Sequence, residues 1–132
     1  RLDKYEWSAT DAWERDNDWV LMRYAEVLMM QAEAYYRLGY TQTALGFVNK
    51  IRARAGLADL TELTDETLDR EWLHEFAFEG LRRTTNIRFG TWYQPWWNKD
   101  ADPADKHTGL FPIPAEERAK NPNLHQNPGY ND

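Results

Sequence analysis

Three glutamates follow one another at four-residue spacing: Glu71, Glu75 and Glu79. On a helix this spacing places them on one face, with successive Cβ atoms about 6 Å apart. Carboxylate pairs carry out general acid–base chemistry, including glycoside hydrolysis, when burial separates their pKa values. No nucleophile or positioned histidine accompanies them, so we expect a solvated or arginine-paired helix face and no catalytic site; a carbohydrate-active enzyme is the alternative. The nearest arginines are Arg70, Arg82 and Arg83.

Histidine and aspartate supply two further candidate sets, which could bind a metal ion. The histidines are His74, His107 and His125. The aspartates form a D-x-D-x-x-D run at Asp100, Asp102 and Asp105. No two histidines lie four residues apart, and the aspartate run lacks the central glycine and distal glutamate of a calcium loop. We therefore predict no metal site and no cofactor, with a carboxylate partner for His74, and keep calcium at the aspartates as an alternative.

A cluster of large aromatic residues surrounds Pro95. Its members are Trp92, Tyr93, Trp96 and Trp97. Such rings can stack on the C–H face of a sugar while their N–H and O–H groups form hydrogen bonds, which makes them candidate ligand-binding residues. They can equally anchor an irregular segment, since each ring buries a large area and needs one polar partner. We favour the anchoring role, because a ligand site also needs convergent polar groups.

Composition excludes several other functions. The chain has 132 residues, a net charge of −6 and no cysteine. An acidic chain is a poor partner for nucleic acid, and the lack of cysteine excludes disulfides, thiolate metal sites and cysteine nucleophiles. Ser8 is the only serine, and the chain has no Gly-rich phosphate loop. No run of about 18 apolar residues is present, so no membrane span is predicted.

Two helices at 19–38 and 42–55 are predicted to hold the first half of the chain together, after an extended lead-in at 1–17. Asp18 is a good N-cap for the first helix, and Gly39 suits its C-cap. With Thr41 as the second cap, the short turn between the helices predicts an antiparallel hairpin over 18–56. The apolar positions expected in the core of the first helix are Val20, Tyr24, Val27, Leu28, Met30, Ala34, Tyr35 and Leu38.

The second half is predicted to be less regular. A third helix begins after Thr64 and ends at Gly80, and a short helical turn from Arg82 to Phe89 completes the segment 64–90. The stretch 91–132 is irregular, because proline and glycine interrupt it, with one short helix around Glu116–Arg118. We therefore expect an all-α fold: one helical hairpin, further helices and a loop-rich C-terminal third, in a single domain over 1–132.

Four blocks of the sequence together resemble the SusD/RagB family. The first is RYAEVLMMQAEAYYRLG followed by ALGFVNKIRARAGL, and the second is EFAFEGLRR with IRFG. The third is FPIP, and the fourth is NPNLHQNPGY. Their order and spacing match the family from Asp18 to Tyr130, and the hairpin is similar to a tetratricopeptide unit. The stretch between Gly80 and Arg88 departs from the family's usual aromatic and acidic residues.

The resemblance implies a function in nutrient uptake. It implies the C-terminal part of an outer-membrane lipoprotein of Bacteroidetes-type bacteria, anchored by a lipid outside this chain and exposed at the cell surface. It also implies binding of an oligosaccharide or another nutrient, in partnership with a SusC-like TonB-dependent outer-membrane transporter. The family's sugar-contacting residues lie upstream and match no position here, so this part would be mainly scaffold. The alternative is a helical, tetratricopeptide-like protein–protein adaptor.

Overall fold

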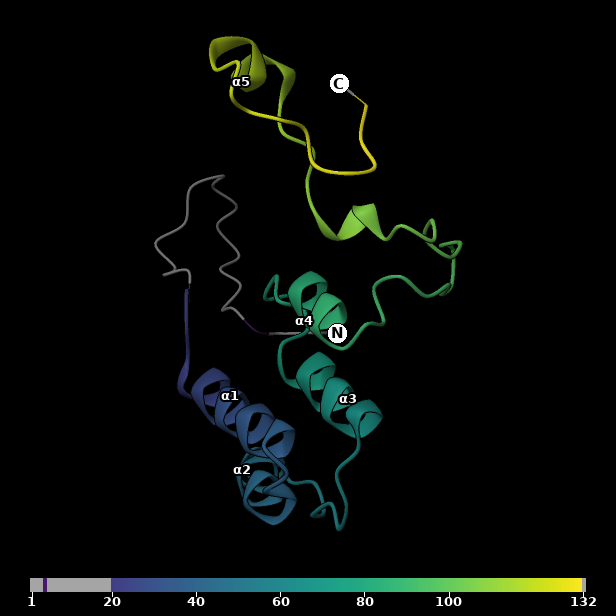
Figure 1. Cartoon of the computed structure of the whole chain (residues 1–132). Coiled ribbons are helices and arrows are strands. Elements are labelled where there is room, and N and C mark those ends of the chain that lie inside the picture. Colours follow the sequence, from purple (N-terminus) through teal and green to yellow (C-terminus); the bar gives the residue numbers. More distant parts are fainter. Residues whose placement is uncertain (1–3, 5–19, 132) are drawn as a thin grey trace, which may run out of the picture. The chain divides into compact units, whose positions relative to one another are not determined.

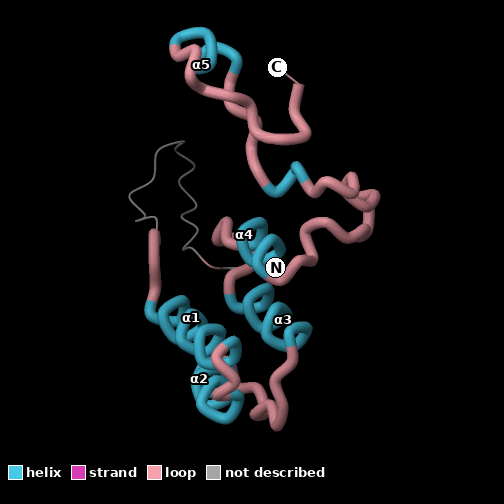
Figure 2. Tube along the Cα trace, in the orientation of Figure 1, coloured by secondary structure: helices cyan, strands magenta, loops and turns pink. Residues whose placement is uncertain are grey.

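The computed structural model describes Lys4 and residues 20–131 of the chain (Figure 1). The chain divides into two compact units, Arg1–Asp59 and Leu60–Asp132, and each is described by itself. In the described residues five α-helices and one 3-10 helix account for the regular structure, and Trp96–Lys99 is an isolated bridge (Figure 2). The predicted all-α fold is thus confirmed. The grouping of all segments into one domain stays a prediction.

An antiparallel hairpin of two helices forms the first unit. It consists of α1 (Tyr24–Arg37) and α2 (Thr41–Arg54), which pack against each other (Figure 1). Gly39 takes a φ of +85°, its N–H donates to the Tyr36 carbonyl at 2.9 Å, and the Tyr40 N–H donates to the Tyr35 carbonyl at 2.8 Å. This pair of bonds is a Schellman motif, which confirms the predicted C-cap.

The first helix is shorter than predicted, and its core face differs. It begins at Tyr24 instead of Trp19, and the predicted cap Asp18 lies outside the described residues. The buried apolar residues of the hairpin are Leu28, Met29, Ala32, Ala44, Leu45, Val48 and Ile51. Those that were expected in the core but are exposed are Val20, Tyr24, Val27, Met30, Ala34, Tyr35 and Leu38. Because α1 is apolar on several sides and α2 packs on one, periodicity did not identify the buried side.

The second unit begins with α3 (Asp65–Glu75), whose start was predicted correctly. Thr64 is the N-cap: the Thr67 N–H donates to its hydroxyl at 3.2 Å, and the Thr64 N–H donates to the Thr67 hydroxyl at 2.7 Å. These two bonds form a capping box, which satisfies two backbone donors at the helix start. Asp65 lies in the first turn, where its negative charge favours the helix dipole.

The end of α3 lies five residues before the predicted Gly80. Phe76 is the C-cap, and the chain then turns through Phe78 and Gly80, with φ values of +66° and +79°. A left-handed residue cannot continue a right-handed helix, so Phe78 ends the pattern that the sequence suggested. The next helix, α4 (Arg82–Arg88), follows directly and lies against α3, close to its predicted bounds.

Loops dominate the rest of the second unit, as predicted. They carry the 3-10 helix η1 (His107–Gly109), which the sequence did not predict, and α5 (Ala115–Lys120) after the N-cap Pro114 (Figure 2). In the part of the chain that the structure describes, no helix combines the length and apolar character needed to cross a membrane.

Candidate functional site

A tight turn carries two of the four candidate aromatic residues. The Trp96 N–H donates to the Lys99 carbonyl at 3.1 Å, and the Lys99 N–H donates to the Trp96 carbonyl at 2.9 Å. Trp97 and Asn98 occupy the corners, and Asn98 takes a φ of +65°, which asparagine tolerates better than most residues. The Trp97 side chain is 92% exposed and Trp96 is 41% exposed. The turn therefore presents indole surface to solvent.

The base of this turn is held by ring and charge contacts. The Trp92 and Trp96 rings meet edge to face, with centroids 5.6 Å apart. Lys99 places its ammonium 4.9 Å from the Trp96 centroid and 5.8 Å from the Trp92 centroid. The same ammonium forms an ion pair with Asp102 at 3.1 Å. Cation–π and ion-pair contacts on one lysine fix the turn against the chain that follows it.

Trp92 is half-buried and links the turn to η1. Its indole N–H donates to the Thr108 hydroxyl at 3.2 Å. Arg83, on α4, lies 5.2 Å from the Trp92 ring and 4.1 Å from the Phe111 ring. The Arg83 guanidinium also donates to the carbonyls of Thr108 at 3.1 Å and Gly109 at 3.2 Å. One arginine thus connects α4, the aromatic loop and the chain around η1.

Tyr93 is half-buried as well. The Lys106 ammonium lies 5.3 Å from its ring, and the Asp102 N–H donates to its carbonyl at 3.1 Å. Its ring also lies over Gly109, where a Cβ atom would overlap the tyrosine hydroxyl. The four candidate residues therefore divide: Trp92 and Tyr93 anchor the loop, whereas Trp96 and Trp97 face outward.

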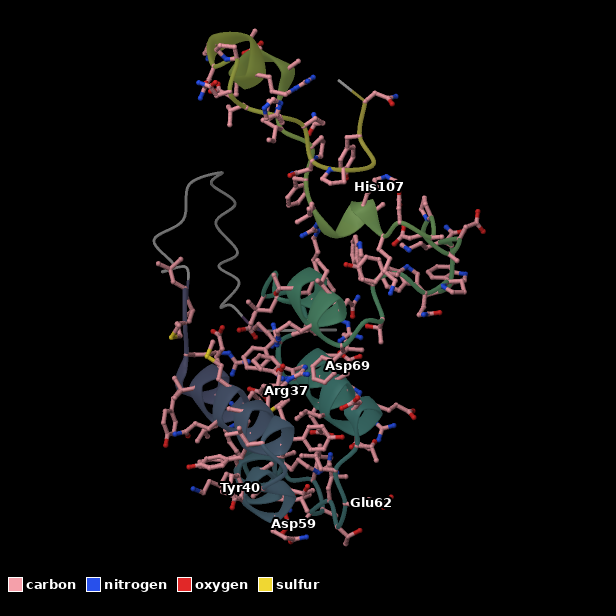
Figure 3. The ribbon with its side chains drawn as sticks, in the orientation of Figure 1. Arg37, Tyr40, Asp59, Glu62, Asp69 and His107 are labelled. Atoms are coloured by element: carbon pink, nitrogen blue, oxygen red, sulfur yellow. The ribbon has the colours of Figure 1, made fainter. Side chains whose placement is uncertain are left out.

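The 3-10 helix also holds the end of the chain. His107, labelled in Figure 3, meets Tyr130 edge to face at 4.8 Å, and the Tyr130 hydroxyl donates to the Leu110 carbonyl at 2.8 Å. Two nitrogens of His107 contact Asp105: the backbone N–H donates to Oδ1 at 3.2 Å, and ring Nδ1 lies 2.7 Å from Oδ1. The hydrogen bonds from the His107 side chain and backbone lower the pKa of Asp105.

Two amide side chains join the third and fourth sequence blocks. The Ile113 N–H donates to Gln126 Oε1 at 2.8 Å, and Gln126 Nε2 donates back to the Ile113 carbonyl at 3.0 Å. Asn127 Nδ2 donates to the Phe111 carbonyl at 2.8 Å. Since prolines in FPIP cannot donate, these amides satisfy backbone groups that no neighbouring strand reaches.

The three glutamates do not form the single helix face that their spacing predicted. Glu71 and Glu75 belong to α3, but Glu79 lies beyond its end. Glu71 is 6% exposed, so of the two alternatives, a solvated or an arginine-paired face, the solvated one is wrong for that residue. Glu79 is separated from the other two glutamates because the left-handed turn at Phe78 redirects the chain before it.

An arginine also pairs with a carboxylate outside this set of three glutamates. Arg82 forms a two-pronged ion pair with Asp69 on α3, which is 8% exposed and labelled in Figure 3. The partner was missed because Asp69 and Arg82 are 13 residues apart and only the break after α3 brings them together. The only signal in the sequence was that Asp69 directly follows Leu68, an apolar position of the predicted helix.

The candidate metal ligands are not gathered in the described part of the chain, where no three histidine or acidic side chains are arranged to hold an ion. Asp102 pairs with Lys99 and Asp105 with His107, so two of the three aspartates have protein partners. His74 and His125 are exposed, and among the described residues the histidine–carboxylate pair occurs at His107 instead of His74.

A separate cleft of about 430 Å³ lies in the first unit, between the start of α1 and the end of α2. Leu28 and Ile51 form part of its apolar floor, and Tyr24 lies at its edge. Its basic lining residues are Arg23, Lys50 and Arg54. This basic rim distinguishes the cleft from the aromatic turn, which three aspartates follow.

Comparison with known proteins agrees with the four sequence blocks. The model of the SusD family matches residues 2–130. The starch-binding protein SusD of Bacteroides thetaiotaomicron is 34% identical over 123 residues, covering 87% of this chain and 22% of that protein. The SusD-like protein P2 of Formosa agariphila is 30% identical over 139 residues, covering 89% of this chain and 27% of that protein.

A solved structure agrees in fold as well as in sequence. The crystal structure of a SusD-like protein from Bacteroides fragilis superimposes with a TM-score of 0.73 at 30% identity, over 85% of this chain and 26% of that one. The chain spans about a quarter of the length of the relatives that it matches. The chain belongs to the SusD family.

Proposed function

We propose that this chain is the helical C-terminal part of a longer glycan-binding protein at the bacterial cell surface. The observation that carries the proposal is the match to the SusD family over residues 2–130, together with 34% identity to a protein named as starch-binding. In that protein the chain would act mainly as scaffold, and a TonB-dependent outer-membrane transporter of the SusC type would take up the bound glycan.

The contacts of the second unit support a scaffold role. Arg83, Gln126 and Tyr130 each join segments that are more than a dozen residues apart. Such long-range side-chain bonds fix loops that have no sheet or helix to order them. A loop-rich segment fixed in this way can keep one shape beside a partner, and association then costs less ordering entropy.

A binding function without catalysis fits the arrangement of the acidic residues. Asp69 is engaged by Arg82, Asp102 by Lys99 and Asp105 by His107. Glu71 and Glu79 are separated by the end of α3. Members of the SusD family are binding proteins, so the proposed role of this chain follows from its family and does not require an acid–base pair.

The proposal is tested by titration calorimetry on two proteins, the full-length protein and the isolated chain 1–132. Against a panel of neutral and charged oligosaccharides, we expect the full-length protein to bind at least one glycan and the isolated chain to bind weakly or not at all. Failure of the full-length protein to bind any oligosaccharide would refute glycan binding. Equal affinity of the isolated chain would refute the scaffold role.

Partnership with a transporter needs its own experiment. Affinity purification of the full-length protein from native outer membranes should recover a TonB-dependent transporter in near-equal amount, and recovery without one would contradict the proposed partnership. The family match already disfavours a free-standing helical adaptor. A signal peptide with a lipid-accepting cysteine upstream of this sequence would exclude that adaptor.

A further inference from the structure

We propose that Trp97, at the tip of the turn Trp96–Lys99, contacts the C–H face of a neutral pyranose in the glycan that the longer protein binds. The inference rests on the proposed glycan-binding function and assigns one contact within it. Of the four candidate aromatic residues, it assigns the contact to Trp97, which lies next to Trp96 in the turn.

Little in the described part of this chain covers the Trp97 side chain. It is 92% exposed, whereas Trp92 and Tyr93 are half-buried and engaged by Thr108, Arg83 and Lys106. A tryptophan can bury about 150–250 Å² of surface, so leaving one in water forgoes a large hydrophobic gain. An exposed indole at a turn tip is therefore available for a ligand.

The turn presents this indole on a rigid base. Two reciprocal backbone bonds close the turn between Trp96 and Lys99, and the Lys99 ammonium is shared between the Trp96 ring and the Asp102 carboxylate. The Trp96 ring rests edge to face on Trp92, which η1 holds through Thr108. A contact residue on a pre-organised base loses little conformational entropy when it binds.

A sugar ring fits this surface better than other apolar partners do. An indole offers a flat apolar face and one N–H donor. A pyranose has a C–H face edged by hydroxyl groups, and two residues close to Trp97 in the sequence, Gln94 and Asn98, are exposed and carry amide donors and acceptors. The same surface therefore provides both stacking and hydrogen bonding.

The charges near the turn select against anionic ligands. Residues 99–106 carry three negative charges and two positive charges; these residues are Asp100, Asp102, Asp105, Lys99 and Lys106. Lys99 is neutralised by Asp102, so the turn has no free cation to hold a carboxylate, sulfate or phosphate. The acidic run also opposes docking onto an anionic lipid surface. These charges point to a neutral glycan.

The test uses the full-length protein and titration calorimetry with maltohexaose, cellohexaose, mannohexaose and hexagalacturonate. Trp97→Ala should weaken binding of the preferred neutral hexasaccharide roughly tenfold, as truncation of an interface tryptophan does. Trp97→Phe should retain most of the affinity, because it keeps a ring. Tyr24→Ala removes another exposed aromatic residue, 73% exposed, at the basic cleft, and it should leave the affinity unchanged.

Four outcomes would overturn the assignment. Wild-type affinity in Trp97→Ala would remove Trp97 from the site and leave glycan binding intact. Loss of affinity in Tyr24→Ala alone would move the site to the cleft. A lowered melting temperature for Trp97→Ala, with unchanged affinity, would make Trp97 a packing residue of the longer protein. A preference for hexagalacturonate that depends on Trp97 would refute the neutral class. Absence of binding by the wild type itself would refute the proposed function before any variant is made.

Discussion

Arg82 joins α4 to α3 through a two-pronged ion pair with Asp69. The two guanidinium nitrogens lie 2.6 Å and 2.8 Å from the two carboxylate oxygens, and the first also donates to the Asp69 carbonyl at 3.3 Å. The Asp69 side chain is mostly buried, whereas the Arg82 side chain is about one-third exposed. The planar guanidinium matches a carboxylate in this geometry, and lysine cannot reproduce it.

We therefore expect Arg82→Lys to destabilise the second unit by about 1–2 kcal/mol, less than a fully buried pair because solvent reaches the guanidinium. Asp69→Asn should cost a similar amount, since it removes the charge and keeps the shape. The measurement is the free energy of unfolding of the full-length protein in denaturant. Arg70→Lys is the matched control: Arg70 lies 4.0 Å from an exposed Glu66 and should change stability by no more than about 0.5 kcal/mol. Equal effects at positions 70 and 82 would contradict this role.

Gly109 is required by the Tyr93 ring and not by its backbone conformation. A Cβ atom at this position would overlap the Tyr93 hydroxyl and lie 3.2 Å from ring carbon Cζ. We expect Gly109→Ala to destabilise the protein by about 1–3 kcal/mol, the usual cost of overpacking. Thermal unfolding of the full-length protein provides the measurement.

A control and a rescue separate packing from backbone entropy at Gly109. Gly46, within α2, has no atom from outside its own stretch of helix within 4 Å of the position that a Cβ atom would take, so Gly46→Ala should stabilise the protein by about 0.5–1 kcal/mol. Removing the tyrosine hydroxyl in Tyr93→Phe should recover part of the loss in the double variant with Gly109→Ala. A loss that Tyr93→Phe leaves unchanged would show that the ring contact is not the cause.

Local rules predicted the helix ends that depend on nearby residues. Thr64 starts α3 and Gly39 ends α1, because in both cases the capping residue and its partners lie within five positions. The end of α3 was missed because it depends on a left-handed Phe78, a conformation that no propensity rule favours for a bulky residue.

Long-range contacts determined what the sequence could not predict. The core face of α1 was misjudged because the helix is apolar on several sides and periodicity does not say where α2 packs. The aromatic cluster was identified as a group, but its division into inward Trp92 and outward Trp97 depends on Thr108 and Arg83, which approach from elsewhere in the chain. Such contacts depend on the course of the loops in space, which cannot be predicted from amino-acid composition.

The Asp105–His107 contact predicts that the packing around Tyr130 is sensitive to acid. Hydrogen bonds from His107 lower the pKa of Asp105, so the folded state favours the carboxylate. This contribution is fully present above the ordinary aspartate pKa of about 3.9 and is lost as the pH falls through the lowered value. We expect the Tyr130 ring, which packs on His107, to lose order over that acidic range.

The measurement is the NMR line shape of Tyr130 as the pH is lowered from about 5 toward 2.5. Asp105→Asn should remove this acid transition, because its amide carries no charge in either state. Asp100→Asn is the control, since Asp100 is exposed and outside the contact with His107. A transition that persists in Asp105→Asn would assign the acid sensitivity to another group.

Gln126 supplies the bonds that a neighbouring strand would supply in a sheet. Its Oε1 accepts from the N–H groups of Ile113 and Asn127, at 2.8 Å and 2.9 Å, and its Nε2 donates to the Ile113 carbonyl. In Gln126→Glu the carboxylate can still accept from both N–H groups but can no longer donate. It would face the Ile113 carbonyl, so we expect this variant to lose about 1–3 kcal/mol of local stability.

Hydrogen exchange at the Ile113 amide in the full-length protein measures that loss directly. Gln126→Ala should exchange fastest, roughly 10-fold or more above the wild type, because it leaves the Ile113 N–H and carbonyl without partners. Gln126→Glu should be intermediate, since the bond to the Ile113 N–H survives. Gln94→Glu makes the same amide-to-acid change at an exposed residue and should leave exchange at Ile113 unaltered. If both Gln126 variants protect Ile113 as the wild type does, the link between FPIP and the closing segment is carried by Asn127 and Tyr130, through their bonds to Phe111 and Leu110.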